Sequence, residues 1–194
     1  MKNKLTTRQL TIAAGLAALS ALVQIIHIGY LSPQWGMWID IVAVTWIIAL
    51  FLFGLRMAFI VSIIGAVIIT LVAPDTWLGA GMKWLASAPI FLLLGLWTMK
   101  VKQKNPLNYY KKISHLVTPV VIGIVIRCIV ILPLNYYYAI PIWTKMTPVE
   151  AMHAIPWYII ALFNILQSLI DVALAWILVY KFRLDRYASH PSEE

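Results

Sequence analysis

Six runs of mostly apolar residues, each near the length that crosses a lipid bilayer, divide this sequence. A membrane-spanning helix needs about 20 apolar residues, and few soluble domains contain so many runs of this kind. The composition agrees, with 62% hydrophobic and 11% charged residues and a mean hydropathy of +0.88. We expect an all-α membrane protein, a single domain of six transmembrane helices over residues 1–194. The helices are expected at about 9–30, 38–53, 57–73, 78–99, 115–134 and 154–181.

Two boundaries in this series are open to a second interpretation. The first run follows Lys2, Lys4 and Arg8, and a signal peptide also begins with basic residues before an apolar stretch. The further runs that come after it favour a retained helix. The second and third runs are divided only by residues 54–56, so they are the least distinct of the series.

The positions of the basic residues predict the orientation in the membrane. The chain has 15 Lys and Arg against 7 Asp and Glu, a net charge of +8, which by itself would also fit a nucleic-acid-binding protein. Twelve of the 15 lie at alternate ends of the runs: Lys2, Lys4, Arg8, Arg56, Lys100, Lys102, Lys104, Lys111, Lys112, Lys181, Arg183 and Arg186. Cytoplasmic loops carry the excess of Lys and Arg. We therefore expect both termini and loop 100–114 in the cytoplasm, and a multi-pass plasma-membrane protein in contact with lipid and not with nucleic acid.

The last run carries polar residues inside its apolar span. Asn164, Gln167, Ser168 and Asp171 are spaced i, i+3, i+4 and i+7, so a helix places them on one face. Polar groups at membrane depth are costly without partners, so this polar stripe must face protein or a ligand. Interhelical hydrogen bonds that hold the bundle together and a binding site are both open explanations.

A second buried charge is expected opposite this stripe. Arg127 lies about 18 Å into the fifth run and Asp171 about 15 Å from the cytoplasmic end of the sixth, by the helical rise per residue. Isolated charges rarely persist at such depth. We therefore predict an intramembrane ion pair between Arg127 and Asp171, structural in role.

Aromatic and charged residues near the outer ends of the runs have two interpretations each. Trp35 and Trp38 are typical of interfacial anchors, or they form an aromatic cap over a pocket. Asp40 either caps the second helix or meets a ligand. Lys83 either extends to the interface or, with Trp84, points into the same pocket.

The first helix has a face of small residues. Ala14 and Ala18 are four residues apart, a spacing that allows close approach of another helix. The partner is either a helix of the same bundle or another subunit.

Residues for catalysis or metal binding are not found in a recognisable pattern. His27 has no second His at metal-ligand spacing, Cys128 lies within an apolar run, and no phosphate-binding loop occurs. We expect neither an enzyme nor a metal site, and no catalytic cofactor.

Four motifs together resemble one family. They are residues 14–20 (AGLAALS), residues 82–86 (MKWLA) followed by Pro89 and Gly95, residues 132–136 (LPLNY) and residues 163–167 (FNILQ). In this order and spacing the chain resembles the S components of energy-coupling-factor (ECF) transporters, the membrane subunits that bind the substrate, and specifically the riboflavin-type subfamily.

This resemblance implies a six-helix vitamin-binding subunit with its site at the outer side. It implies docking through Ala14 and Ala18 on a transmembrane coupling subunit that is driven by two ATPases. It also implies that Asn135 and Asn164 contact the flat ring of the ligand. Gln167 departs from the family pattern, which usually has Lys at this position, so the identity of the ligand stays open.

The leading hypothesis is capture of riboflavin or a related flat heteroaromatic vitamin. The amides of Asn135, Asn164 and Gln167 offer donors and acceptors to a ring edge. Further expected site residues are Asp40, Lys83 and the aromatics Trp35, Trp84, Tyr136 and Trp157, which have faces to stack on a ring. The alternatives are an S component for another small vitamin or precursor, an intramembrane enzyme, and a purely structural subunit whose polar stripe is fully self-paired.

Overall fold

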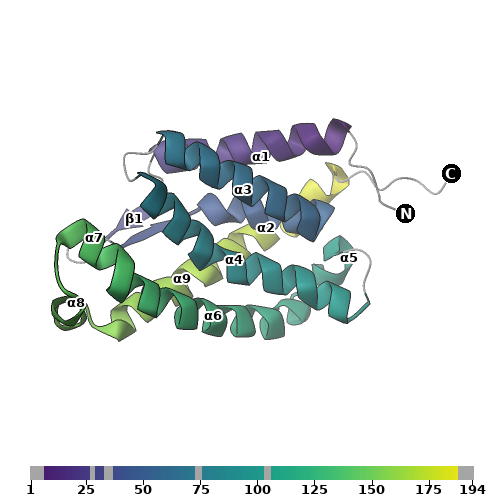
Figure 1. Ribbon diagram of the computed structural model, residues 1–194. Helices are drawn as coiled ribbons and strands as arrows, with labels where there is room; N and C mark the ends of the chain where they lie inside the picture. Colours follow the sequence, from purple (N-terminus) through teal and green to yellow (C-terminus); the bar gives the residue numbers. More distant parts are fainter. Residues whose placement is uncertain (1–6, 27–28, 33–36, 73–75, 103–105, 188–194) are drawn as a thin grey trace.

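The computed structural model describes residues 7–26, 29–32, 37–72, 76–102 and 106–187, and nearly all of them are helical. The long helices are α1 (Thr7–Ile26), α2 (Val42–Phe53), α3 (Leu55–Val72), α4 (Thr76–Lys100), α6 (Ser114–Leu134) and α9 (Trp157–Trp176). Shorter elements are α5 (Pro106–Tyr110), α7 (Ile140–Thr144), α8 (Pro148–Ala154), the π-helical turns η1 (Asn135–Ala139) and η2 (Ile177–Lys181), and the 3₁₀ turn η3 (Leu184–Tyr187). Figure 1 shows the long helices running side by side along one axis.

The described chain is nearly all helical, as expected, and it also contains a short hairpin that the expectation of an all-α chain did not include. Between α1 and α2 lie two short antiparallel strands, β1 (Gly29–Leu31) and β2 (Trp38–Asp40), in which Gly29 is opposite Asp40 and Leu31 opposite Trp38. Paired strands satisfy the backbone N–H and C=O groups of a connection that is not helical. Residues 38–40, expected at the start of the second helix, belong to this hairpin instead.

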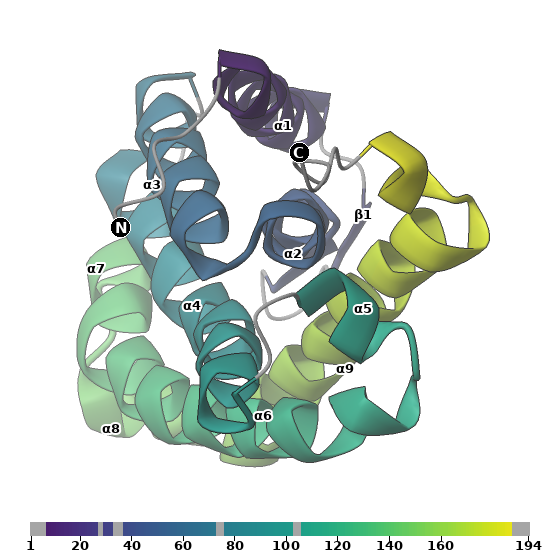
Figure 2. The ribbon, with the colours of Figure 1, turned by 90° about the vertical axis from the view of Figure 1, so that its right-hand side faces the viewer.

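Helix α2 lies at the centre of the bundle. In the view along the axis, α1, α3, α4, α6 and α9 surround it (Figure 2). Every residue from Val42 to Phe51 is buried. A helix that is apolar on all sides must be covered on all sides, and Trp46, which packs edge-to-face on Phe91 of α4, is one of its contacts. The second apolar run is therefore the core of the protein.

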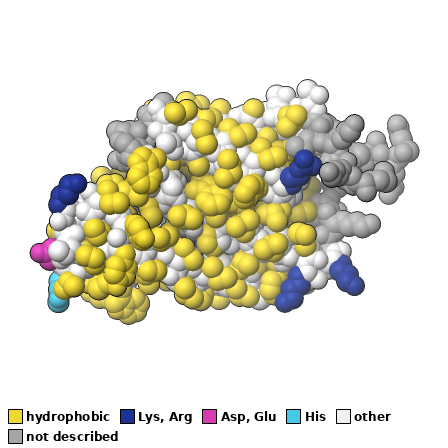
Figure 3. All heavy atoms as spheres, viewed as in Figure 1, with side chains coloured by type: hydrophobic (Ala, Val, Ile, Leu, Met, Phe, Trp, Pro, Cys, Tyr) yellow, Lys and Arg dark blue, Asp and Glu magenta, His cyan; other side chains and the backbone are white. Residues whose placement is uncertain are grey.

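The outer surface is apolar along the length of the bundle (Figure 3). Among the described residues, four helical segments are long and apolar enough to cross a membrane: Thr7–Ile25, Trp77–Lys100, Ser114–Thr144 and Trp157–Lys181. Two shorter apolar helices, Val42–Phe53 and Leu55–Leu71, occupy the positions of the second and third expected spans. Six spans therefore remain a prediction for the chain as a whole.

The fifth and sixth spans differ from their expected bounds. Helix α6 continues through the π-helical turn η1 into α7, so the apolar helix ends at Thr144 and not at residue 134. Pro133 and Pro141 flank this turn, and each removes a backbone donor from the regular helical ladder. The sixth span begins at Trp157, directly after Pro156, because residues up to Ala154 belong to α8.

A local signal explains where α8 begins. The side chain of Thr147 accepts a hydrogen bond from the backbone N–H of Glu150 (3.3 Å), and the Glu150 carboxylate accepts one from the N–H of Thr147 (2.7 Å). This reciprocal pair is a capping box. The hydrogen bonds from the Thr147 backbone and side chain lower the pKa of Glu150.

The start of α1 and the end of η2 lie at one end of the bundle, and the hairpin, α7 and α8 lie at the other (Figure 1). Exposed Lys and Arg gather mainly at the first of these ends in Figure 3. This distribution supports the cytoplasmic assignment of that end.

Thiol labelling tests this orientation. In a Cys128→Ala background, a cysteine at exposed Val149 of α8 should react with a membrane-impermeant maleimide added to intact cells. A cysteine at exposed Ser114 should react only after the cells are opened. Labelling of both positions from one side would contradict the expected topology.

Candidate functional site

A cavity of about 660 Å³ lies at the end of the bundle that holds the hairpin and α7. Its walls come from α1, β1, β2, α3, α4, α6, η1, α7 and α9. This volume is in the range of sites for small organic ligands. Five predicted site residues line it together although they are far apart in the sequence: Asp40, Lys83, Asn135, Asn164 and Gln167.

Other predicted aromatic residues lie outside the cavity. The Trp84 indole donates to Ser62 Oγ of α3 (3.1 Å) and packs edge-to-face on Phe59, so it faces away from the cavity. Tyr136 is buried and its hydroxyl donates to the Ile155 carbonyl (2.7 Å). Trp157 is 63% exposed at the start of α9. None of these three residues lines the cavity, and Trp35 and His27 fall outside the described residues.

The aromatic and apolar wall includes residues that were not among the expected site residues. Trp38 of β2, Trp143 of α7 and Phe163 of α9 line the cavity, together with Met82 of α4. For Trp38 the sequence left two interpretations open, an interfacial anchor and an aromatic cap over a pocket. Trp143 lies beyond the expected end of its helix, and Phe163 was recognisable only as the neighbour of Asn164.

Lys83 joins three elements beside the cavity. Its ammonium group forms an ion pair with the Asp40 carboxylate and donates to Gln24 Oε1 of α1 (2.6 Å). The other Asp40 oxygen accepts from the Val42 N–H at the start of α2 (2.9 Å). Lys83 therefore points inward instead of extending to the interface, and Asp40 both stabilises the start of α2 and faces the cavity.

Hydrogen bonds of Gln167 attach the hairpin to α9. Its Oε1 accepts from the Asp40 backbone N–H (2.9 Å), and its Nε2 donates to the Asp40 carbonyl (2.7 Å) and to Asp171 Oδ1 (2.8 Å). Both N–H groups and the carbonyl oxygen of the amide are thus engaged within the protein. The amide was expected to meet a ligand. In the structure Gln167 lines the wall of the cavity, and its amide holds Asp40 and Asp171.

The predicted ion pair between Arg127 and Asp171 is not formed. Arg127 Nε donates to Asn164 Oδ1 (2.7 Å) and Nη1 donates to Ser168 Oγ (3.1 Å), whereas Asp171 is held by Gln167. The depths expected from the helical rise were nearly right, because Arg127 contacts Ser168, about one turn from Asp171. Rotation about the helix axes decides the partner, and α9 presents Asn164 and Ser168 to the guanidinium.

The two asparagines are partly engaged with their own helices. Asn135 Nδ2 donates to the Ile131 carbonyl (3.0 Å), and Asn164 Nδ2 donates to the Ile160 carbonyl (2.8 Å). In the described part of the chain, Asn135 Oδ1 accepts no hydrogen bond. Asn135 therefore offers a free acceptor to the cavity.

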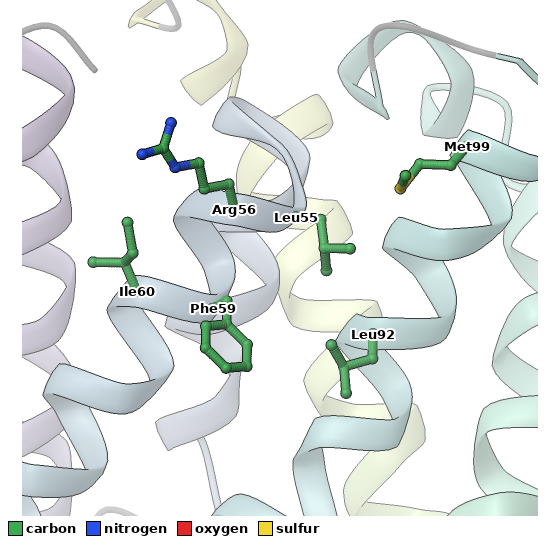
Figure 4. A pocket seen from close by; sticks show the side chains of 6 residues that line it. All are labelled: Leu55, Arg56, Phe59, Ile60, Leu92 and Met99. Carbon is green, nitrogen blue, oxygen red and sulfur yellow. The ribbon is translucent and has the colours of Figure 1, made fainter. Parts of the chain in front are cut away.

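A second hollow of about 550 Å³ lies between α3 and α4 (Figure 4). It is lined by Leu55, Arg56, Phe59, Ile60, Leu92 and Met99. None of the predicted site residues belongs to it. An apolar hollow with one basic residue offers few groups to recognise a polar metabolite, so the cavity beside the hairpin is the candidate site.

Comparison with known proteins identifies the family. The sequence profile described as "ECF transporter, substrate-specific component" matches residues 8–181. The chain belongs to this family. A solved structure of the S component of a bacterial ECF transporter matches with a TM-score of 0.65 and 22% sequence identity, covering 94% of this chain and 98% of that one. A comparison with curated proteins finds no match.

The general role of this ECF substrate-specific component follows from its family. Such components are transport proteins of the plasma membrane, and they work with an ECF module made of a transmembrane T component and ATPases. On α1 of this S component, Ala14 and Ala18 are exposed, whereas Ala13, Ala17 and Ala21 are buried against the bundle. The small-residue face at Ala14 and Ala18 is thus free to meet another subunit.

Proposed function

We propose that this S component captures riboflavin, or a closely related flat heteroaromatic vitamin, in the cavity beside the hairpin for ATP-driven uptake. Capture from outside is supported by the position of the cavity at the end opposite most of the basic residues. In this proposal the ATPases of the module supply the energy, and Ala14 and Ala18 dock on the T component.

The observation that carries the proposal is the mixed lining of the cavity. Trp38, Trp143 and Phe163 offer aromatic faces, while Arg127 and Asn135 offer donors and an acceptor. Flat rings gain from aromatic contact beyond the area they bury. The dioxopyrimidine edge of a flavin alternates carbonyl acceptors with an N–H donor, and this pattern is complementary to those polar side chains.

Another small vitamin is the alternative ligand, because Gln167 departs from the pattern of the riboflavin-type subfamily. The resemblance to the riboflavin-type subfamily predicts Lys at this position, and here an amide is used to hold the hairpin. A ligand in this cavity meets Arg127 and Lys83 as its cationic neighbours, so the contacts at the ring edge differ from those the resemblance implies.

A binding titration tests the proposal. Purified protein, stripped of any co-purified ligand, should quench riboflavin fluorescence with a saturable curve. Asn135→Ala should weaken binding by about 1–3 kcal/mol, because the ligand group it faces is left unpaired. Trp143→Ala should also weaken binding through the loss of aromatic contact.

The matched control is Trp157→Ala, which removes an exposed tryptophan outside the cavity and should leave the Kd unchanged. Absence of riboflavin binding together with saturable binding of another flat vitamin would transfer the assignment to that vitamin. Equal effects of Trp143→Ala and Trp157→Ala would contradict the location of the site.

A further inference from the structure

Arg127 has hydrogen-bonding capacity that the protein itself does not use. The residue lines the cavity and is only 4% exposed. Nε and Nη1 donate to Asn164 and Ser168, both neutral partners. Within the described chain, Nη2 donates no hydrogen bond and Arg127 forms no ion pair. The guanidinium therefore has donors left at the wall of the site.

A ligand that accepts a hydrogen bond would stabilise the buried Arg127 guanidinium. Buried cations within membrane-spanning helices are normally paired or hydrogen-bonded, because they have lost their water. Asp171, the carboxylate expected to pair with Arg127, is bound to Gln167 instead. An oxygen acceptor arriving in the cavity would complete the hydrogen bonds of the guanidinium, and hydrogen bonds to charged groups are the stronger kind.

The spare groups of the other side chains point to the same chemistry. Lys83 has three N–H donors, and within the described residues it uses two of them, on Asp40 and Gln24. Gln24 Oε1 accepts from Lys83, and no residue that the structure describes accepts from the Gln24 amide N–H groups. Asn135 Oδ1 is a spare acceptor, and the Asp40 carboxylate is already engaged by Lys83 and Val42. Among the described residues, Lys83, Gln24 and Arg127 thus keep N–H donors at the polar side of the cavity, and these suit an oxygen acceptor of a ligand.

We infer that Arg127 is the specificity-determining residue of this cavity: its Nη2 binds an oxygen acceptor of the transported molecule. The substrate class is therefore a neutral or anionic molecule with carbonyl or carboxylate oxygens. This inference rests on the proposed function of the cavity as the substrate site. It assigns to Arg127 a contact with the substrate in addition to its hydrogen bonds to α9.

The test combines changes in the protein with changes in the ligand. Riboflavin, its 2-thio and 4-thio analogues, pantothenate as a carboxylate and thiamine as a cation are titrated against the purified protein. Arg127→Met should weaken binding of the preferred oxygen-bearing ligand roughly tenfold to a hundredfold, the loss of a charged hydrogen bond. Arg127→Lys, which keeps the charge but loses the planar fork, should also bind more weakly. Val125→Met on the exposed face of α6 is the matched control and should bind normally.

The thio analogues test the contact without depending on the folding of a variant. Sulfur accepts hydrogen bonds poorly, so one of the two analogues should bind wild-type protein more weakly than riboflavin, and Arg127→Lys should reduce that difference. Preferred binding of thiamine, unchanged affinity in correctly folded Arg127→Met, or equal affinity for riboflavin and both thio analogues would overturn the inference. If riboflavin fails and pantothenate binds in an Arg127-dependent way, the riboflavin assignment falls and the inference stands. Binding of no probe at all would overturn both.

Discussion

Replacing Gln167 with leucine is expected to abolish tight substrate binding and to lower the thermal stability of the protein. The amide makes three hydrogen bonds, two to the backbone of Asp40 and one to Asp171. Leucine has a similar size and none of these groups. Each buried polar partner left without a hydrogen bond costs about 1–3 kcal/mol. The hairpin would lose its attachment to α9, and with it the cavity would lose the wall that carries Trp38.

The measurement is thermal unfolding in detergent with and without ligand, together with the Kd. Gln167→Lys provides a graded comparison, because lysine retains donors for the Asp40 carbonyl and for Asp171 but has no acceptor for the Asp40 N–H. It should fall between wild type and Gln167→Leu. Leu166→Ala, one residue away and exposed on α9, is the control for the helix itself and should bind normally. Wild-type affinity in Gln167→Leu would show that the hydrogen bonds between Gln167 and the hairpin do not maintain the site.

Replacing Ala18 with tryptophan is expected to abolish transport and to leave ligand binding to the isolated subunit intact. Ala18 and Ala14 are exposed on α1, next to Gly15, where an added Cβ would meet no atom within 4 Å. A small surface of this kind permits close approach of a second helix. A bulky side chain would keep the T component away from α1 without disturbing the bundle. Uptake of labelled substrate by cells and binding to purified protein measure the two effects separately.

Ala17→Trp is the matched comparison one residue away. Ala17 is 0% exposed, so tryptophan there must displace the core and should reduce both folding and binding. Co-purification of the ECF module with each variant shows whether assembly is the step that fails. Normal uptake by the Ala18→Trp variant would exclude this face of α1 as the docking surface.

The membrane-protein class and most helices were predictable because they depend on local properties. Long apolar runs can only satisfy their backbone groups as helices in a bilayer, and all the long helices lie within or close to the expected ranges. The inward orientation of Gln167, Ser168 and Asp171 also followed from spacing alone, and the structure confirms that these side chains are buried. Four of the five polar residues predicted for the site mark polar positions on otherwise apolar helical segments, and the fifth, Asp40, ends strand β2 at the same cavity.

The pairing of these residues was decided by the tertiary structure. Helical rise placed Arg127 and Asp171 at similar depth, but the hydrogen bonds go to Asn164 and Ser168 because pairing depends on how α6 and α9 are rotated against each other. Trp84 faces Ser62 for the same reason. A shift of a few ångströms between helices, set by contacts far away in sequence, exchanges one hydrogen-bond partner for another. The apolar pattern of the chain therefore determined which residues are buried at which depth. Only the packing of the bundle determined which atoms of Arg127 and Asn135 have no hydrogen-bond partner among the described residues.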